Sequence, residues 1–325
     1  MLQKIRVVPL AAESLGVRSL CSYIETSDLR ILLDAGVSLG PNRFGLSPHP
    51  KEYEALAECR KAIGAAADKA EVVTLSHYHF DHHTPSFTDW CYNWSSEEVA
   101  RRIYDGKTVL AKSYRSKVNS SQRRRGWMFS KTGGSCAKNL RYADGRTFEF
   151  GETKVKFSEP VFHGAEDSPL GWVLMVAIEH EDEKILYASD VQGPMANSTL
   201  QLILAQNLHM IIIGGPPTYL SGLVKQEDVQ QGIQNLELLT QRVPLTILDH
   251  HLLRDEEWRQ VSQPVIDSAS NAGHWVITAA EFLKRQNNLL ECQRKELFEV
   301  EPPDSEFERW MKLPSLKRKQ IKPPI

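Results

Sequence analysis

The sequence has few cysteines and lacks long apolar runs. Its five cysteines are odd in number and include no Cys-x-x-Cys pair, so the chain predicts neither a disulfide framework nor a thiolate zinc site. No apolar stretch approaches the ~20 residues that a membrane-spanning helix needs. The first eight residues are too charged and their apolar run too short for a signal peptide. We therefore expect a cytoplasmic protein without a membrane partner.

The chain also lacks a strong overall charge. Its formal net charge is −2 over 325 residues, which is ordinary for a globular protein, and the length suits one large α/β core. We expect a catalytic domain over residues 1–300 and a proline-rich, basic tail over 301–325. The composition of this tail favours an extended or disordered segment that either aids solubility or binds a partner. The composition carries no signal for an oligomeric state.

Apolar, β-branched segments alternate with amphipathic ones along the chain. Helical periodicity is present at 52–67, 227–242 and 256–270. Strands interleaved with amphipathic helices predict an α/β protein whose sheets are covered by helices. The expected strands are 5–10, 20–25, 30–34, 72–76, 107–111, 147–150, 154–157, 172–179, 184–188, 210–213 and 245–248.

A cluster of histidines follows one of these strands. Residues 76–83 read Ser-His-Tyr-His-Phe-Asp-His-His, which places four imidazoles and a carboxylate directly after Val72–Leu75. Imidazole and carboxylate are ordinary ligands of zinc and related divalent ions. On an extended chain His77, His79 and Asp81 share one face, and a turn can direct His79 and His82 to different metals. The alternative, a solvated histidine-rich turn, fits this density and strand-end position poorly.

The spacing His-x-His-x-Asp-His resembles the signature of the metallo-β-lactamase fold superfamily. The other motifs of that superfamily have counterparts here, in the same order along the chain: Asp34 before Gly36, His163, Asp190, and His250 or His251. Three further stretches, 13–19, 214–219 and 249–255, resemble a poorly characterised archaeal branch of it. The resemblance implies a four-layer αββα sandwich of two similar halves, the first ending near residue 150.

The resemblance also implies a centre of two divalent ions. One would be held by His77, His79 and His163, the other by Asp81, His82 and the last histidine, with Asp190 as the bridge. Zinc is the expected metal, with manganese or iron as alternatives. Such a centre supports hydrolysis by a metal-bound hydroxide, and Asp81 is expected to be catalytic through the second ion. Asp190 could instead simply cap a helix.

Two choices among histidines follow from strand register. The segment Thr246–His250 parallels Val73–His77, in which the first histidine after the strand is the ligand, so His250 is favoured over His251. His251 would then support a ligand or face the substrate.

Two further residues have supporting or neutral interpretations. Asp34 is expected to hold a ligand or its loop in place, or else to be a turn carboxylate. His83 either orients Asp81 or Asp190, or is an exposed neighbour of the segment 76–82, which carries four of the candidate ligands and is called the metal loop below.

The segment 101–141 contains twelve Lys or Arg and one acid, Asp105. Basic and aromatic side chains together suit phosphate groups or single-stranded nucleic acid, and Arg123, Arg124 and Arg125 are the candidate substrate contacts. A solvated basic surface is the alternative. We expect a metal-dependent hydrolase of a phosphate ester or nucleic acid. The alternatives are a hydrolase of a small thioester or lactone, a metal-containing nucleic-acid-binding protein, and an iron-containing redox member of the superfamily.

Overall fold

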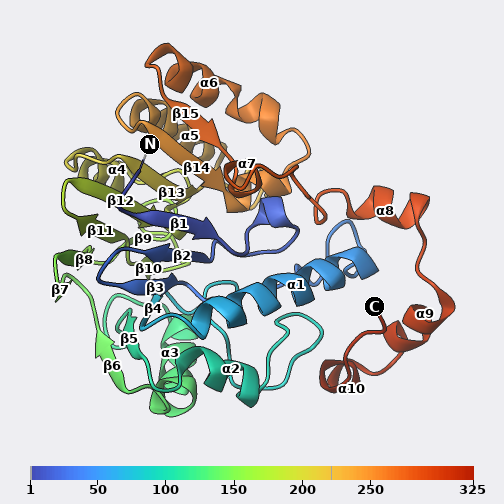
Figure 1. Ribbon diagram of the computed structural model, residues 1–325. Coiled ribbons are helices and arrows are strands. Elements are labelled where there is room, and N and C mark those ends of the chain that lie inside the picture. Colours follow the sequence, from blue (N-terminus) through green and yellow to red (C-terminus); the bar gives the residue numbers. More distant parts are fainter. Residues whose placement is uncertain (1, 221) are drawn as a thin grey trace.

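The computed structural model describes residues 2–220 and 222–325, and two sheets form its centre (Figure 1). In the first sheet the three leading strands are antiparallel and the remaining ones join in parallel. Its spatial order is β1 (Arg6–Pro9), β2 (Ser22–Glu25), β3 (Arg30–Leu33), β4 (Val72–Leu75), β5 (Thr108–Ala111) and β6 (Asn139–Tyr142).

The second sheet has a parallel part and an antiparallel part. Strands β12 to β15 are parallel, so their carboxyl ends meet at one edge, where Gly214 pairs with Asp249. A separate pair, β9 (Val161–Phe162) and β10 (Trp172–Val173), lies outside this sheet. The order of the second sheet is β15 (Trp275–Ile277), β14 (Leu245–Asp249), β13 (Met210–Gly214), β12 (Glu183–Ala188), β11 (Val176–His180), β8 (Thr153–Phe157) and β7 (Thr147–Phe150).

Helices cover the outer face of each sheet. Those on the first sheet are α1 (Pro50–Ala67), α2 (Glu97–Tyr104) and α3 (Ser120–Lys131), and those on the second are α4 (Asn197–Leu204), α5 (Gln226–Thr240) and α6 (Trp258–Asn271). The shorter helices towards the C-terminus are α7 (Ala279–Phe282), α8 (Arg294–Val300), α9 (Ser305–Met311) and α10 (Ser315–Gln320). Short 3-10 turns are η1 (Glu13–Leu15), η2 (Gly133–Ser135), η3 (Ser189–Val191) and η4 (His250–Arg254).

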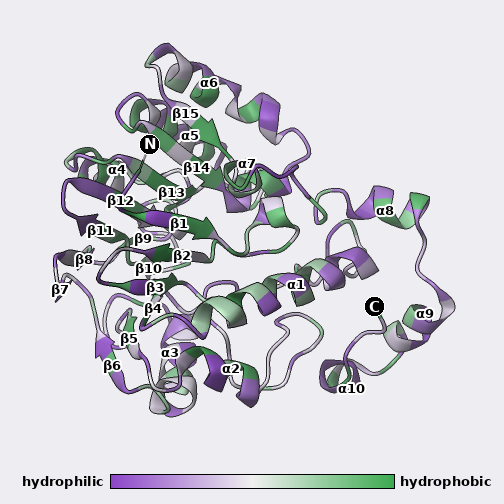
Figure 2. Cartoon of the chain, viewed as in Figure 1, coloured by the Kyte–Doolittle hydropathy of each residue, from purple (hydrophilic) through white to green (hydrophobic). Residues whose placement is uncertain are grey.

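Successive side chains along each strand point to opposite faces of its sheet, and this alternation separates the layers of the core. Ile31 and Leu33 of β3 pack between the sheets with Tyr187 and Ile212, whereas Leu32 faces the helices of the first sheet. Hydrophobic residues accordingly concentrate in the central strands, and α1 and α6 carry hydrophilic residues as well (Figure 2). The predicted four-layer αββα sandwich is therefore confirmed. Each described helix falls short of the length or the hydrophobicity that crossing a bilayer takes.

The predicted strands lie close to the observed ones, with one division and three omissions. The expected strand 172–179 is divided into β10 and β11, and β6, β9 and β15 are missing from the expected strands. The expected helices at 52–67, 227–242 and 256–270 correspond to α1, α5 and α6.

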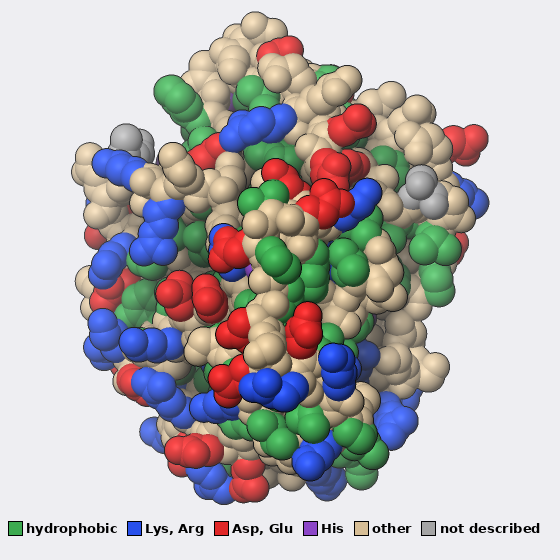
Figure 3. All heavy atoms as spheres, turned by 90° about the vertical axis from the view of Figure 1, so that its right-hand side faces the viewer, with side chains coloured by type: hydrophobic (Ala, Val, Ile, Leu, Met, Phe, Trp, Pro, Cys, Tyr) green, Lys and Arg blue, Asp and Glu red, His purple; other side chains and the backbone are tan. Residues whose placement is uncertain are grey.

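The segment 301–325 differs from its expected extended or disordered form. It contains α9 and α10, and Phe307 and Trp310 are buried against Tyr53 of α1, with ring centroids 5.6 and 5.4 Å from the Tyr53 ring. Figure 1 shows α8, α9 and α10 along the end of α1. Figure 3 shows the side of the molecule that lies on the right in Figure 1. Acidic and basic side chains are interspersed on it, with Lys and Arg gathered towards the left and lower edges. Two aromatic anchors spaced one helical turn apart outweigh the prolines, because their burial stabilises the ordered form.

Candidate metal centre

The histidine cluster after β4 forms a tight turn rather than an extended strand. The backbone N–H groups of His82 and His83 both donate to the carbonyl of His79, at 3.0 Å each. This turn reverses the chain, so that His77, His79, Asp81 and His82 surround one region at the edge of the first sheet.

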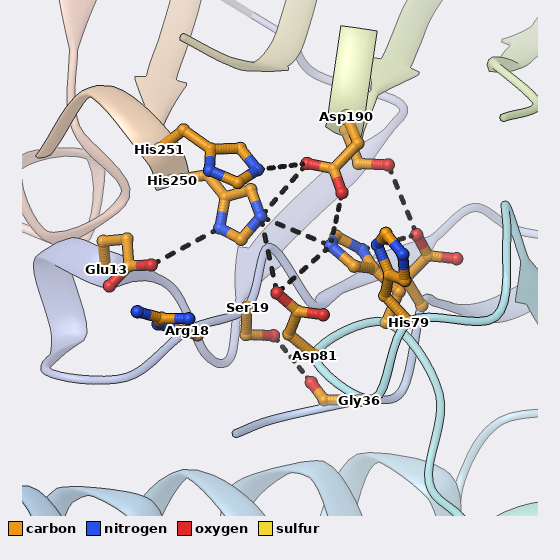
Figure 4. A network of polar contacts seen from close by, with 12 residues as sticks. Glu13, Arg18, Ser19, Gly36, His79, Asp81, Asp190, His250 and His251 are labelled. Carbon is orange, nitrogen blue, oxygen red and sulfur yellow. Dashed lines mark hydrogen bonds and ion pairs between the residues drawn. The ribbon is translucent and has the colours of Figure 1, made fainter. Parts of the chain in front are cut away.

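The second sheet and the separate β9–β10 pair bring further polar side chains to the same place. His163 follows β9, Asp190 lies in η3 after β12, and His250 begins η4 after β14. These three residues come from strand ends that open towards the turn after β4, and Figure 4 shows Asp190 facing His79, Asp81 and His250. The site is therefore built by both halves of the molecule.

Asp190 is at the middle of the cluster, and each of its oxygens faces a different set of imidazoles. Its Oδ2 lies 3.1, 3.2 and 3.3 Å from Nε2 of His77, His82 and His163. Its Oδ1 lies 3.1 Å from Nε2 of His250. A carboxylate with its two oxygens directed to two groups of donors is suited to bridging two cations.

The candidate ligand atoms fall into overlapping groups, each with all its atoms within 4.8 Å of one another. One group contains His77, His79, His163 and Asp190, and another contains Asp81, His82 and His250. These are the two sets that the resemblance implies for the two ions.

His251 belongs to a third group, with Asp190 and His250. Its Nε2 is 3.3 Å from Asp190 Oδ1, so both histidines of this pair reach the bridge position. His250 alone of the two also approaches the second set, with its Nε2 3.3 Å from His82 Nε2 and 3.8 Å from Asp81 Oδ2.

The cluster fits divalent cations by its unsatisfied polar atoms. His77 Nε2 and Asp190 Oδ1 are buried, and although they lie 3.1 Å from Asp190 Oδ2 and His250 Nε2, neither atom makes a hydrogen bond of acceptable geometry within the described residues. Buried polar atoms in proteins are almost always partnered, so atoms of this kind that point into a shared space call for a bound group. Imidazole and carboxylate are ligands of zinc, iron and manganese, whereas Mg²⁺ and Ca²⁺ favour oxygen ligands alone.

The protonation states favoured by the surroundings also suit a cation. Burial lowers the pKa of His77 well below its usual value and that of His79 to about 3, which keeps both imidazoles neutral. Burial alone would lower the pKa of His82, but Asp190 and Asp81 raise it well above its ordinary value. The two carboxylates therefore favour positive charge beside them, and a bound metal ion could supply this charge in place of the proton on His82.

Asp34 holds the metal loop from below. Its carboxylate is buried and accepts hydrogen bonds from Ser76 N at 2.7 Å, from the Ser76 hydroxyl, and from Tyr187 Oη at 3.1 Å. It also contacts His82 Nδ1 at 3.0 Å, which leaves His82 Nε2 directed to the cluster. Gly36 allows the backbone of His82 and His83 to pack closely against the end of β3, since a Cβ at this position would lie 2.2 Å from the His83 backbone nitrogen.

A buried arginine supports the other side of the cluster. Arg254 pairs with Glu13, and its two terminal nitrogens lie 3.3 Å from His250 Nδ1 and 3.1 Å from His251 Nδ1. Tyr219 Oη accepts a further hydrogen bond from Arg254 at 3.1 Å. Burial raises the pKa of Glu13, and the charge of Arg254 acts in the opposite direction.

Sequence reasoning did not single out Glu13, Tyr219, Arg254 or Gln122. The first three lie in the three stretches 13–19, 214–219 and 249–255 that carry the archaeal resemblance, and the fold joins these stretches beside His250. Gln122 had no signal: it is buried, accepts from Tyr78 N at 2.7 Å, and lies 3.3 Å from His79 Nε2.

The remaining predicted residues lie at the border of the cluster. His83 is buried, contrary to the exposed alternative, and its ring packs on Tyr78 and Phe129 rather than on Asp81 or Asp190. Arg125 lies with its guanidinium 4.5 Å from the centre of the Phe80 ring.

The other members of the predicted basic segment have varied surroundings. Arg123 and Arg124 are exposed on α3, and Arg123 donates to the carbonyl of Arg115 at 3.0 Å. Lys112 is buried and pairs with Asp144 at 2.6 Å, and Arg102 pairs with Asp68 at 2.6 Å. Part of the positive charge in 101–141 is therefore neutralised locally.

The sandwich and the histidine–aspartate cluster at its edge define a protein of the metallo-β-lactamase fold. No family model matches the chain. Among curated relatives, it is 44% identical over 294 residues to UPF0282 protein MK0213 of Methanopyrus kandleri, covering 90% of this chain and 99% of the relative. It is 43% identical over 302 residues to a UPF0282 protein of Thermococcus gammatolerans, covering 93% and 97%. The chain belongs to the UPF0282 family.

Solved structures of the same fold share little sequence with the chain. The metallo-β-lactamase fold protein YhfI from Bacillus subtilis is 11% identical with a TM-score of 0.49, and the match covers 85% of this chain and 96% of YhfI. Igni18, a metallo hydrolase from Ignicoccus hospitalis KIN4/I, is 12% identical with a TM-score of 0.44, and the match covers 85% of this chain and 95% of Igni18.

Proposed function

We propose that the protein is a hydrolase with a centre of two divalent metal ions and that its substrate is a phosphate ester. The observation that carries this proposal is the position of Asp190: its Oδ2 lies 3.1 to 3.3 Å from His77, His82 and His163 and its Oδ1 3.1 Å from His250, so this carboxylate contacts both groups of candidate ligands. A structural zinc site needs four closed protein ligands, whereas the two groups of candidate ligands, Asp190 included, offer seven here. The surplus favours a catalytic centre.

We assign the ligands by the two groups of donor atoms that lie within 4.8 Å of one another. His77, His79 and His163 would hold one ion, Asp81, His82 and His250 the other, and Asp190 would bridge them. Support for His250 as the last ligand comes from its closeness to Asp81 and His82, and we assign to His251 a supporting position at the bridge. Two such ions, when bound, supply Lewis acidity and lower the pKa of a shared water.

The chain's own residues prepare the site for a phosphate group. Asp34 and Arg254 fix the orientation of His82 and His250, so the donor atoms are held in place before a ligand arrives. Asp81 retains 16% side-chain exposure, so the cluster meets solvent at this residue. Arg125 contacts Phe80, the residue before Asp81, and a guanidinium suits the paired oxygens of a phosphate.

Metal analysis together with substrate assays tests the proposal. We expect two divalent ions per chain in the wild type and turnover of phosphodiesters in preference to thioesters and lactones. Asp81→Ala removes a ligand of the second ion and leaves the set of His77, His79 and His163, so one ion should remain and most activity should be lost. The exposed carboxylate on α6 gives a control, Asp267→Ala, with unchanged metal content. Equal metal content in Asp81→Ala and wild type would contradict the ligand assignment, and thioester turnover alone would replace the substrate class.

A further inference from the structure

A pocket of about 500 Å³ lies between the metal loop and α3. Its apolar walls are Phe80, Phe87, Met128 and Phe129, and two arginines of α3, Arg124 and Arg125, also line it. It thus combines a large apolar lining with two positive charges.

The pocket adjoins the metal cluster through one residue. Phe80 stands between His79 and Asp81 in the chain, and its ring forms an edge contact with Phe87 at a centroid distance of 5.3 Å. Arg125 covers Phe80 with its guanidinium and donates to the carbonyl of Tyr78 at 3.5 Å. A molecule in the pocket would therefore have its charged end beside Arg125, next to the metal loop.

The apolar walls are open rather than packed. Phe87 is 45% exposed and Met128 is 46% exposed, so both present apolar surface that a ligand could cover. Phenyl edges and a thioether sulfur both make favourable contacts with an aromatic ring. A guanidinium pair favours phosphate over a neutral group.

We propose that this pocket binds the aromatic group of a phosphate ester, with Arg124 and Arg125 contacting its anionic part. The proposal rests on the proposed function and narrows the substrate to phosphate esters that carry an aromatic ring. The proposal also gives Arg123 a different role from its two neighbours, because Arg123 lies outside the pocket lining and donates to the carbonyl of Arg115.

Binding of two phosphonates tests the pocket without relying on turnover. Phenylphosphonate and methylphosphonate share one head group, so the ratio of their dissociation constants isolates the contribution of the ring. Calorimetry on the metal-loaded protein should give about a tenfold preference for phenylphosphonate, the order expected for favourable ring contacts. Phe87→Ala and Met128→Ala should each reduce this preference several-fold, and methylphosphonate binding should change little.

Trp127→Ala is the matched control. Trp127 is next to Met128 on α3 and is 48% exposed, but it does not line the pocket, so its removal should leave the preference unchanged. Likewise Arg124→Ala should weaken both phosphonates and Arg123→Ala neither. The proposal is overturned if the wild type shows no preference for the ring, if neither phosphonate binds, or if Trp127→Ala acts as strongly as Met128→Ala. Because metal content and phosphodiester turnover are measured separately, these outcomes are distinct from a failure of the proposed function.

Discussion

Arg254 has a position that decides how two histidines are held. Its guanidinium lies within 3.3 Å of Nδ1 of both His250 and His251, and its Nε donates to Glu13. Since groups that orient metal ligands typically alter metal affinity by 10- to 100-fold, Arg254 should influence the second ion more than the first.

We expect Arg254→Met to weaken binding of the second ion by about 10- to 100-fold and to leave the His77–His79–His163 site nearly unchanged. Metal titration that resolves the two binding steps measures this. Arg18 provides a control, because it is a neighbouring arginine that pairs with Glu291 at 2.6 Å. Arg18→Met should lower stability without a selective effect on the second ion. A similar loss of affinity in both variants would assign Arg254 a structural role only.

At this scale the sequence predicted the residues that occur in compact motifs. His77, His79, Asp81 and His82 lie within six positions, so their grouping is visible before folding. Glu13 and Arg254 are separated by 241 positions, and only the fold brings them together. Gln122 was missed for the same reason: its contact with His79 depends on how α3 packs over the metal loop.

At the scale of elements, α3 shows why a helix can lack the hydrophobic pattern by which helices are predicted from sequence. Its buried face is formed by Gln122, Gly126 and Phe129, so two of the three buried positions are not apolar. Gly126 is needed because a Cβ there would lie 2.6 Å from the Tyr78 ring. Most of the strands and α1, α5 and α6 were predictable because burial imposes an apolar pattern on each.

The C-terminal helices show the opposite case, in which composition obscured two buried aromatic residues. Phe307→Ala should destabilise the protein by about 3–5 kcal/mol, because it removes a large buried side chain from the contact with Tyr53. Leu316→Ala on α10 is the control, since Leu316 is 82% exposed and surface changes usually stay within about 0.5 kcal/mol. Urea unfolding of both variants measures the difference. Equal midpoints would indicate that α9 contributes little to the folded state.

At the scale of the whole molecule, the candidate metal centre joins the two sheets. His77, His79, Asp81 and His82 follow β4 of the first sheet, whereas Asp190 and His250 follow strands of the second. The sheets share an apolar interface, but at the edge their contacts are polar and converge on Asp190. The overall sandwich was predictable from the strand and helix pattern together with the motif, whereas this convergence required the strand order of both sheets.

Ions bound at this junction should therefore stabilise the folded protein more than an ion held within a single loop would. A ligand present at 1,000 times its dissociation constant contributes about 4 kcal/mol per site. With an unfolding entropy of about 2.1 cal/mol/K per residue, one such ion in a chain of 325 residues raises the unfolding temperature by about 6 °C.

We expect chelation to lower the unfolding temperature by about this amount for each ion removed, and addition of zinc to restore it. Differential scanning calorimetry with and without chelator measures the shift, and Asp81→Ala should show only the part that belongs to the first ion. His274→Ala is a suitable control, because His274 is hydrogen-bonded to the Thr240 carbonyl and belongs to none of the groups of candidate ligands, so its response to chelator should equal that of the wild type. An unfolding temperature that chelator does not change would mean that the polar junction between the sheets is held by protein contacts alone, and the two-ion centre would have to be abandoned.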